Sequence, residues 1–179
     1  MTLIQSKKLY QDEVLKIHKI LLTGINNDWA GQYRNGNVSI VGASFLPPTH
    51  DVLRGKMNEF MVWLHTTKAH PVLVAAEAPY RLVCIHPFAD GNGRTSRLIM
   101  NLLLLQEGYP LTILKAKEHR AAYLQALRQA DNGNQEAFGS FVARAVLEAI
   151  KEYVEHLTPA SKQEELVTFV LEERKVIMY

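Results

Sequence analysis

The sequence predicts a mainly α-helical protein with one small β-hairpin, and three observations support this prediction. Apolar residues recur at helical spacing over most of the 179 residues. Only one segment, around Asn35-Gly36, has the alternating pattern of paired strands. No internal repeat or low-complexity linker divides the chain, whose length suits one unit at ~100–200 residues per domain. We therefore expect a single domain over residues 1–179.

The first three helices are predicted from their apolar spacing. Residues 11–22 place apolar side chains on one face, and residues 49–64 do the same with Thr49 as the N-cap. A third helix is expected over residues 72–85. Pro79 lies inside it and is expected to kink the helix or to shift its start.

The later helices follow from the same spacing and from their end signals. A fourth helix is expected to begin beyond Asn92 and to stop at the Gly-Tyr-Pro run of residues 108–110. Two more are expected at about 116–130 and 135–156. The charged segment 161–175 is expected to be helical as well.

The hairpin is predicted from two short apolar runs and their turns. Tyr33-Arg34 and residues 38–41 flank Asn35-Gly36, and a second turn at 42–44 leads to Phe45-Leu46. A single hairpin leaves an unpaired strand edge. Such an edge is either an aggregation liability or a docking surface.

Composition and charge exclude several classes of protein. With 20 Lys and Arg against 18 Asp and Glu, scattered along the chain, the net charge is +2 and gives no basic face for nucleic acid. No run approaches the ~18 apolar residues of a membrane helix, and the N-terminus does not resemble a secretion signal. Cys84 is the single cysteine and is expected to be a small buried apolar residue. We expect a cytoplasmic protein that binds neither nucleic acid nor membrane.

The residues that indicate chemistry lie in one segment, residues 86–97, which joins two apolar helices. Backbone N–H groups at the start of a helix bind anions, because they lack partners and meet the positive end of the helix dipole. Gly91 and Gly93 let an anion approach the main chain, and the side chain of Asn92 can donate to the same anion. The segment therefore predicts a phosphate site.

Charged side chains in the same segment extend this prediction. Arg94 and Arg97 lie three residues apart near the helix start, where a bound anion explains them better than helix stability does. Asp90 is short enough to hold Mg²⁺ through one oxygen, and His86 is the group that can take a proton near neutral pH. Taken singly these residues fit a turn, a structural histidine and solvated arginines. Together they favour phosphoryl or nucleotidyl transfer, without a Walker A loop.

Residues 86–97 resemble the Fic-family signature His-x-Phe-x-Asp/Glu-Gly-Asn-Gly-Arg-x-x-Arg at every fixed position. Further matching segments are Tyr33-Arg34, 38–42, Pro47-Pro48, Trp63-Leu64, the run into His86, and 101–110. The resemblance covers about residues 11–155. It implies a Fic-type helical bundle with a β-hairpin flap over the active-site loop, and a C-terminal helical extension at about 161–175.

The resemblance implies a protein adenylyltransferase, which moves AMP from ATP to a Ser, Thr or Tyr hydroxyl of a protein and releases pyrophosphate. It implies His86 as the base, Asp90 as the Mg²⁺ ligand, Gly91, Asn92 and Gly93 as the anion hole, Arg94 on phosphate, Arg97 on the γ-phosphate, and Phe88 as a packing residue. Gly93 disfavours the phosphorylating branch of the family, which has Lys near this position.

Two further regions take expected roles from the resemblance. A flap that docks the target by strand addition matches Val38, Ser39, Ile40, Val41 and Phe45, although a hairpin that only covers the site remains an alternative. Tyr123 and Asp131 fall where the family contacts the nucleoside. Tyr123 fits a core aromatic equally well.

Regulation and the exact reaction stay open at this point. Residues 161–166 and 168–173 carry the Ser/Thr and Glu of the family's inhibitory helix but lack its final Gly or Asn. A separate antitoxin, a degenerate C-terminal inhibitory helix, removal of an N-terminal inhibitory helix, and a homodimer are all left open. The alternatives to AMP transfer are removal of AMP, transfer of another phosphate-containing group, and a nucleotide-binding interaction module. The intact His86 argues against the last, because binding alone needs no base.

Overall fold

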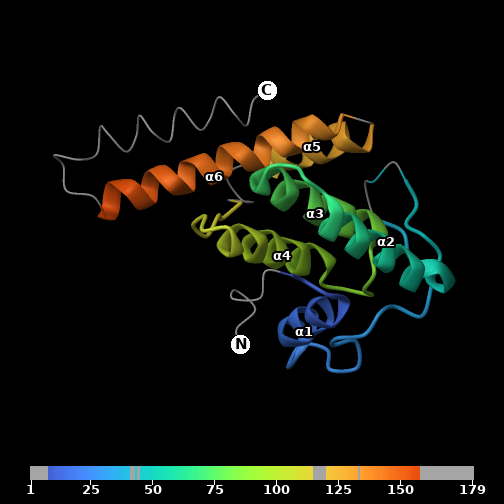
Figure 1. Ribbon diagram of the computed structural model, residues 1–179. Coiled ribbons are helices and arrows are strands. Elements are labelled where there is room, and N and C mark those ends of the chain that lie inside the picture. The colour runs from blue at the N-terminus through green and yellow to red at the C-terminus, as the bar shows by residue number, and fades with distance from the viewer. Residues whose placement is uncertain (1–7, 41–42, 44, 115–119, 133, 158–179) are drawn as a thin grey trace.

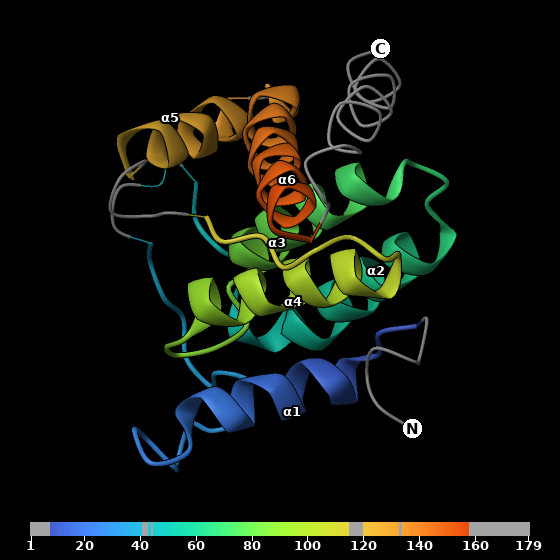
Figure 2. The same cartoon turned by 90° about the vertical axis from the view of Figure 1, so that its left-hand side faces the viewer.

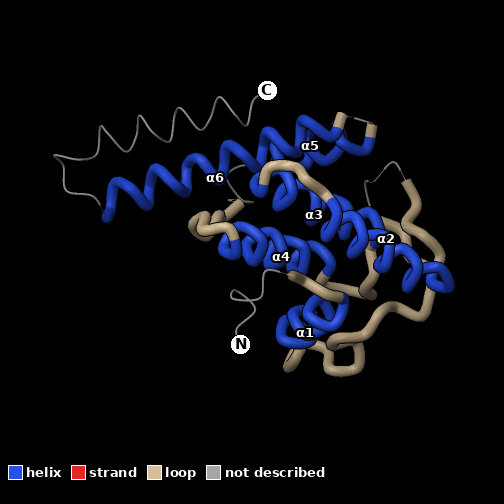
Figure 3. The backbone as a smooth tube through the Cα atoms, viewed as in Figure 1, coloured by secondary structure: helices blue, strands red, loops and turns tan. Residues whose placement is uncertain are grey.

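The computed structural model describes residues 8–40, 43, 45–114, 120–132 and 134–157, and in these ranges the chain is helical without strands (Figures 1 and 3). The elements are α1 (Gln11–Leu22), the 3₁₀ helix η1 (His50–Val52), α2 (Leu53–Thr66), α3 (Pro71–Ile85), α4 (Asn92–Gln106), α5 (Arg120–Asp131) and α6 (Gln135–Leu157). None of the helices in these ranges has the length and apolarity needed to cross a bilayer.

The helix α1 has the predicted bounds. Its first turn carries Asp12 and Glu13, where negative charge suits the helix dipole, and Glu13 accepts a hydrogen bond from the Tyr10 N–H at 3.0 Å. Its buried face packs against α4. Figure 2 shows α1 along one side of the molecule and α5 with α6 along the other, with α3 and α4 between them.

The central helix α3 begins at Pro71, where a proline suits the first helical position, and the side chain of His70 accepts from the Val72 N–H. Pro79 lies inside the helix and is buried, so the proline does not shift the helix start. Both α4 and α6 pack against α3. The two helices that flank the predicted active-site segment are therefore held in the middle of the fold.

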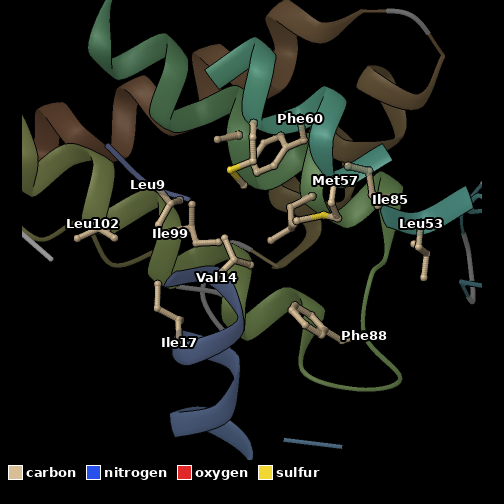
Figure 4. Close-up of a cluster of buried hydrophobic side chains, with 13 residues drawn as sticks. Leu9, Val14, Ile17, Leu53, Met57, Phe60, Ile85, Phe88, Ile99 and Leu102 are labelled. Atoms are coloured by element: carbon tan, nitrogen blue, oxygen red, sulfur yellow. The ribbon is translucent and has the colours of Figure 1, made fainter. Parts of the chain in front are cut away.

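Two clusters of buried apolar side chains form the core. The first joins α1, α2, α3 and α4 and includes Phe88 from the segment between α3 and α4 (Figure 4). The second joins α3, α4, α5 and α6 and includes Phe138 and Val142, which are almost fully buried. Because the first cluster reaches into the α3–α4 segment, core packing contributes to the position of the predicted active-site loop.

One predicted boundary differs from the structure, and two others fall outside the described residues. Thr49 is followed by the 3₁₀ helix η1, and its side chain makes no capping bond there. The predicted start of the fifth helix falls in residues 115–119, outside the described residues, and α5 is described from Arg120. The expected helical extension at 161–175 also lies outside them.

The predicted hairpin is not confirmed. Among its described residues, 33–40, 43, 45 and 46, none is in a strand, while Val41, Gly42 and Ser44 lie outside the described residues. Arg34 explains part of this conformation, because its guanidinium donates to the carbonyls of Gly36 and Pro48. These two carbonyls therefore bind a side chain and not a facing strand.

Candidate active site

The predicted segment is the loop that connects α3 to α4, and His86 is its first residue. His86 ends α3 in the left-handed conformation (φ 50°, ψ 57°), and its N–H donates to the Leu82 carbonyl at 2.9 Å. Residues other than glycine are sterically strained in this region of φ and ψ. Such strain is typical of positions where function fixes the residue type.

The ring of His86 is half-buried and its tautomer follows from one contact. Nδ1 lies 3.2 Å from the Val83 carbonyl oxygen, which can only accept, so Nδ1 carries the proton and Nε2 keeps its lone pair. Burial lowers the pKa of His86, the charge of Arg34 lowers it further, and the hydrogen bond to Val83 opposes both. His86 is therefore neutral at pH 7, the form that a general base requires.

The N-terminus of α4 forms beside His86. Gly91 is the N-cap residue with φ 79°, and a Cβ at this position would lie 2.8 Å from Cδ2 of Leu22 and 3.2 Å from Nε2 of His18. The Thr95 N–H donates to the Gly91 carbonyl at 2.9 Å and begins the helical pattern. The N–H groups that precede it in the first turn have no partner within the helix, which makes this helix end suitable for an anion.

A cavity of about 280 Å³ opens at this helix end. It is lined by His86, Ala89, Asp90, Gly91, Asn92, Gly93, Arg94 and Arg97. The cavity therefore brings together the residues that the sequence predicts for the base, the anion hole, the phosphate-binding arginines and the metal.

Asp90 and Arg94 form an ion pair at the mouth of this cavity. Nη2 of Arg94 lies 2.9 Å from Oδ2 of Asp90, the two side chains are 37% and 53% exposed, and Oδ1 of Asp90 accepts from the Gly91 N–H. No group of three or more His, Cys, Asp and Glu side chains gathers as a metal site in the part of the chain that the structure describes. A Mg²⁺ ion here would take the single carboxylate of Asp90 with phosphate oxygens and water, an arrangement that suits this ion.

Two predicted residues hold the loop from inside. Phe88 is fully buried in the first core cluster, as expected for a packing residue. The Asn92 side chain was expected to donate to an anion, but Oδ1 accepts from the Phe88 N–H at 2.9 Å and Nδ2 donates to the Phe88 carbonyl at 2.8 Å. These bonds close the loop and bury the amide, so the Asn92 side chain is bound to the loop backbone, although the residue still lines the cavity.

Sequence reasoning missed the roles of Arg34 and His18. Arg34 donates from Nε to the His86 carbonyl at 2.8 Å and from its backbone N–H to the Pro87 carbonyl at 2.9 Å. His18 is fully buried and stacks on Phe88, with ring centroids 3.7 Å apart. A polar residue on the apolar face of α1, between Ile17 and Leu21, was the signal that could have identified His18.

The expected nucleoside and flap residues are placed less completely. Tyr123 packs edge-on against Phe138 and Phe141. Burial raises the pKa of its hydroxyl, and the charge of Arg97 and a hydrogen bond to Arg97 oppose this shift. The phenol is therefore a core aromatic whose hydroxyl lies close to Arg97, an arginine expected to bind phosphate. Asp131 ends α5, and its side chain lies outside the described residues. Val38, Ile40 and Phe45 are half-buried and Ser39 is exposed, while Val41 lies outside the described residues.

Known proteins are similar to this chain in fold and in sequence. A model of the Fic/DOC family matches residues 8–104. A protein named protein adenylyltransferase Fic from Aedes aegypti is 42% identical over 134 residues, which are 73% of this chain and 26% of that protein. Its namesake from Nematostella vectensis is 38% identical over 161 residues, which are 88% of this chain and 37% of that protein. The solved structure of Fic-1 from C. elegans superposes with a TM-score of 0.78 at 30% identity and covers 87% of this chain and 47% of that chain.

Proposed function

The chain belongs to the Fic/DOC family, and from this premise we propose that it is a protein adenylyltransferase. The reaction would move AMP from ATP to a Ser, Thr or Tyr hydroxyl of a protein. One observation carries the proposal: the cavity at the start of α4 is lined by a neutral histidine, two arginines and the first residues of the helix. The chain spans 26% and 37% of the two relatives named above, both of which bear this activity in their names.

We assign phosphate binding to the first turn of α4 and to two arginines. Gly91, Asn92 and Gly93 form the anion hole with their backbone N–H groups, once the Gly91 N–H is released from the Asp90 carboxylate that accepts it in the structure. Arg94 binds phosphate, and Arg97 binds the γ-phosphate. This assignment is supported by the position of all five residues on the wall of one cavity. Hydrogen bonds from backbone N–H groups and from guanidinium groups are stronger when the acceptor is charged, as phosphate is.

We assign the Mg²⁺ site to Asp90. When bound, Mg²⁺ would neutralise charge on the ATP phosphates. In the structure Asp90 and Arg94 neutralise each other. Each therefore has to exchange its partner when the nucleotide binds, so that the carboxylate is free for a cation and the guanidinium for phosphate.

The proposed reaction uses His86 at Nε2. This nitrogen takes the proton of the acceptor hydroxyl as the hydroxyl oxygen bonds to the α-phosphorus. The bond from the α-phosphorus to the oxygen that bridges to the β-phosphate breaks, and pyrophosphate leaves with the electron pair. Nδ1 keeps its own proton throughout because the Val83 carbonyl holds it.

We assign docking of the target protein to Val38, Ser39, Ile40, Val41 and Phe45, and contact with the nucleoside to Tyr123 and Asp131. Arg34 supports the docking assignment, because it donates to the carbonyls of Gly36 and Pro48, which flank the docking residues, and to the His86 carbonyl. A target held on this segment would therefore lie close to the base. The charge of Arg97 acts on the Tyr123 hydroxyl and lowers its pKa against the effect of burial, and this closeness to Arg97 supports a place for Tyr123 at the nucleotide.

The test measures transfer of label from α-labelled and γ-labelled ATP to proteins of a cell lysate in the presence of Mg²⁺. Wild-type chain and His156→Ala, a change at an exposed histidine on α6, should both transfer the α-label, and His86→Ala should not. Transfer of the γ-label alone would replace AMP transfer with phosphoryl transfer. ATP binding without transfer of either label, also after Glu165→Gly and Glu172→Gly, would favour a binding module.

A further inference from the structure

We propose that His18 is a positioning residue for the phosphate site, because it ties the carbonyl of Asp90 to α1. The inference rests on the proposed function for its meaning, since it concerns how the same cavity binds ATP. His18 lies outside residues 86–97 and touches the loop from the side that faces the core.

Two backbone groups determine which nitrogen of the His18 ring carries the proton. The Gly31 N–H donates to Nδ1 of His18 at 3.0 Å, so Nδ1 is an acceptor and carries no proton. Nε2 therefore carries the proton and donates it to the Asp90 carbonyl oxygen at 3.0 Å. A neutral imidazole in one tautomer joins α1, the turn at Gly31 and the loop.

Packing holds the ring in the orientation that these bonds require. The imidazole is fully buried and lies parallel to the Phe88 ring, at an interplanar angle of 5°. Burial lowers the pKa of His18, which keeps the ring neutral, and the nearby charge of Arg94 acts in the same direction. The hydrogen bond to the Asp90 carbonyl and the charge of Asp90 oppose this shift.

The position of the Asp90 carbonyl decides where the next N–H points. The C=O and N–H of a trans peptide point in opposite directions. When His18 holds the Asp90 C=O toward α1, the Gly91 N–H points away from α1, to the side where the Asp90 carboxylate accepts it. His18 thus orients the N-cap peptide of α4, at the wall of the cavity.

Two substitutions separate the two bonds of His18. In His18→Gln the side-chain Nε2 can take the place of the imidazole Nε2 and donate to the Asp90 carbonyl. In His18→Asn the Oδ1 can take the place of Nδ1 and accept from Gly31, but the donor to Asp90 is lost. His65→Asn is the control for the loss of a histidine that binds a backbone carbonyl, because the exposed His65 binds that of Leu9 at 2.8 Å.

The experiment measures ATP affinity, melting temperature, and hydrogen exchange of the amides of residues 86–94 in all four full-length chains. We expect His18→Asn to weaken ATP binding by about fivefold to tenfold, the effect of one hydrogen bond, and to speed exchange in the loop. His18→Gln should restore both readouts toward wild type. His65→Asn should lower the melting temperature without changing either.

Two results would overturn the proposal. One is that His18→Asn and His65→Asn, at equal melting temperature, show the same loop exchange rate and the same ATP affinity. The other is equal impairment of His18→Gln and His18→Asn, which would show that only packing matters. Loop exchange needs no nucleotide, so it decides the role of His18 even if the wild-type chain binds or transfers nothing and the proposed function fails.

Discussion

The loop between α3 and α4 has two sides that differ in burial and in charge. On its inner side, Phe88, Asn92 and His18 are almost fully buried. The Asn92 amide bonds to the Phe88 backbone, and Nε2 of His18 donates to the Asp90 carbonyl. On its outer side, Asp90 and Arg94 are partly exposed and charged, and they line the cavity. The inner contacts determine the shape of the loop, and the outer groups are available to a ligand.

Within one short segment, the inner groups therefore stabilise the fold and the outer groups are the ones that can bind a ligand. Exposed ion pairs contribute little to folding, whereas buried aromatic rings and buried amides contribute much. Substitutions on the inner side should therefore lower the free energy of unfolding. Substitutions on the outer side should leave the fold intact and remove ligand binding.

The largest effect on stability is expected from Phe88→Ala on the inner side. Removing this fully buried ring leaves a cavity in the first core cluster, which should lower the free energy of unfolding by about 3–5 kcal/mol. Denaturant titration followed by circular dichroism measures it. Leu46→Ala is the control, because Leu46 is 80% exposed and its loss should change stability by less than about 0.5 kcal/mol. A loss below about 1 kcal/mol for Phe88→Ala would contradict the assignment of the inner side.

The outer side gives the second prediction, Arg94→Gln. This change removes a partly exposed ion pair and a positive charge at the start of a helix, so the free energy of unfolding should change by less than about 0.5 kcal/mol. The Kd for ATP should rise about 10-fold to 100-fold, the effect of a hydrogen bond to a charged group. Calorimetric titration with ATP measures this, with Lys56→Gln on α2 as the charge-matched control. Equal ATP affinity in both variants would exclude Arg94 from the phosphate site.

His86 lies between the two sides and gives the third prediction. Both His86→Ala and His86→Gly remove the base and should abolish transfer. They should differ in stability, because the left-handed backbone of this residue suits glycine, and His86→Gly should be more stable than His86→Ala by about 1 kcal/mol. Denaturant titration of the two variants measures the difference. Equal stability would mean that the backbone of residue 86 relaxes when the imidazole is lost.

The sequence predicted the outer side of the loop better than the inner side. The residues that line the cavity lie within twelve consecutive positions, and their chemistry follows from their types and from the start of a helix. His18 and Arg34 bond to loop residues 72 and 52 positions away in the chain, and no local pattern contains such a contact. The Asn92 side chain was predicted to bind the anion. Its bonds to the Phe88 backbone form only in the folded loop, so the sequence could not predict them.

The helices show the same limit. Regular apolar spacing predicted α1 with its bounds, because that spacing is a local property. The hairpin was predicted from local alternation, but strand pairing depends on where backbone carbonyls find donors. Here the guanidinium of Arg34 occupies the carbonyls of Gly36 and Pro48. A buried arginine with several backbone acceptors is a tertiary feature that alternation does not encode.

The smallest effect should come from pH, because each histidine exchanges one proton and both stay neutral near pH 7. The folded-state pKa values of His18 and His86 are lowered from the ordinary value of 6.5, chiefly by burial. Below pH 6.5 the unfolded chain therefore binds more protons than the folded chain, so the free energy of unfolding should fall as the pH falls. Denaturant titrations between pH 5 and 8 should show that the free energy of unfolding changes less steeply with pH in His18→Gln than in the wild-type chain.

Acid should affect activity through the outer side of the loop and stability through the inner side. Loss of kcat/KM in acid should follow the protonation of His86, with a midpoint below 6.5, because only the neutral ring can take the hydroxyl proton. His18→Gln should leave this midpoint in place while it flattens the stability profile, since His18 orients a carbonyl and does not exchange a proton with the substrate. A shift of the activity midpoint in His18→Gln would show that the inner histidine also sets the protonation of the outer one, and the two sides would then act as one electrostatic unit.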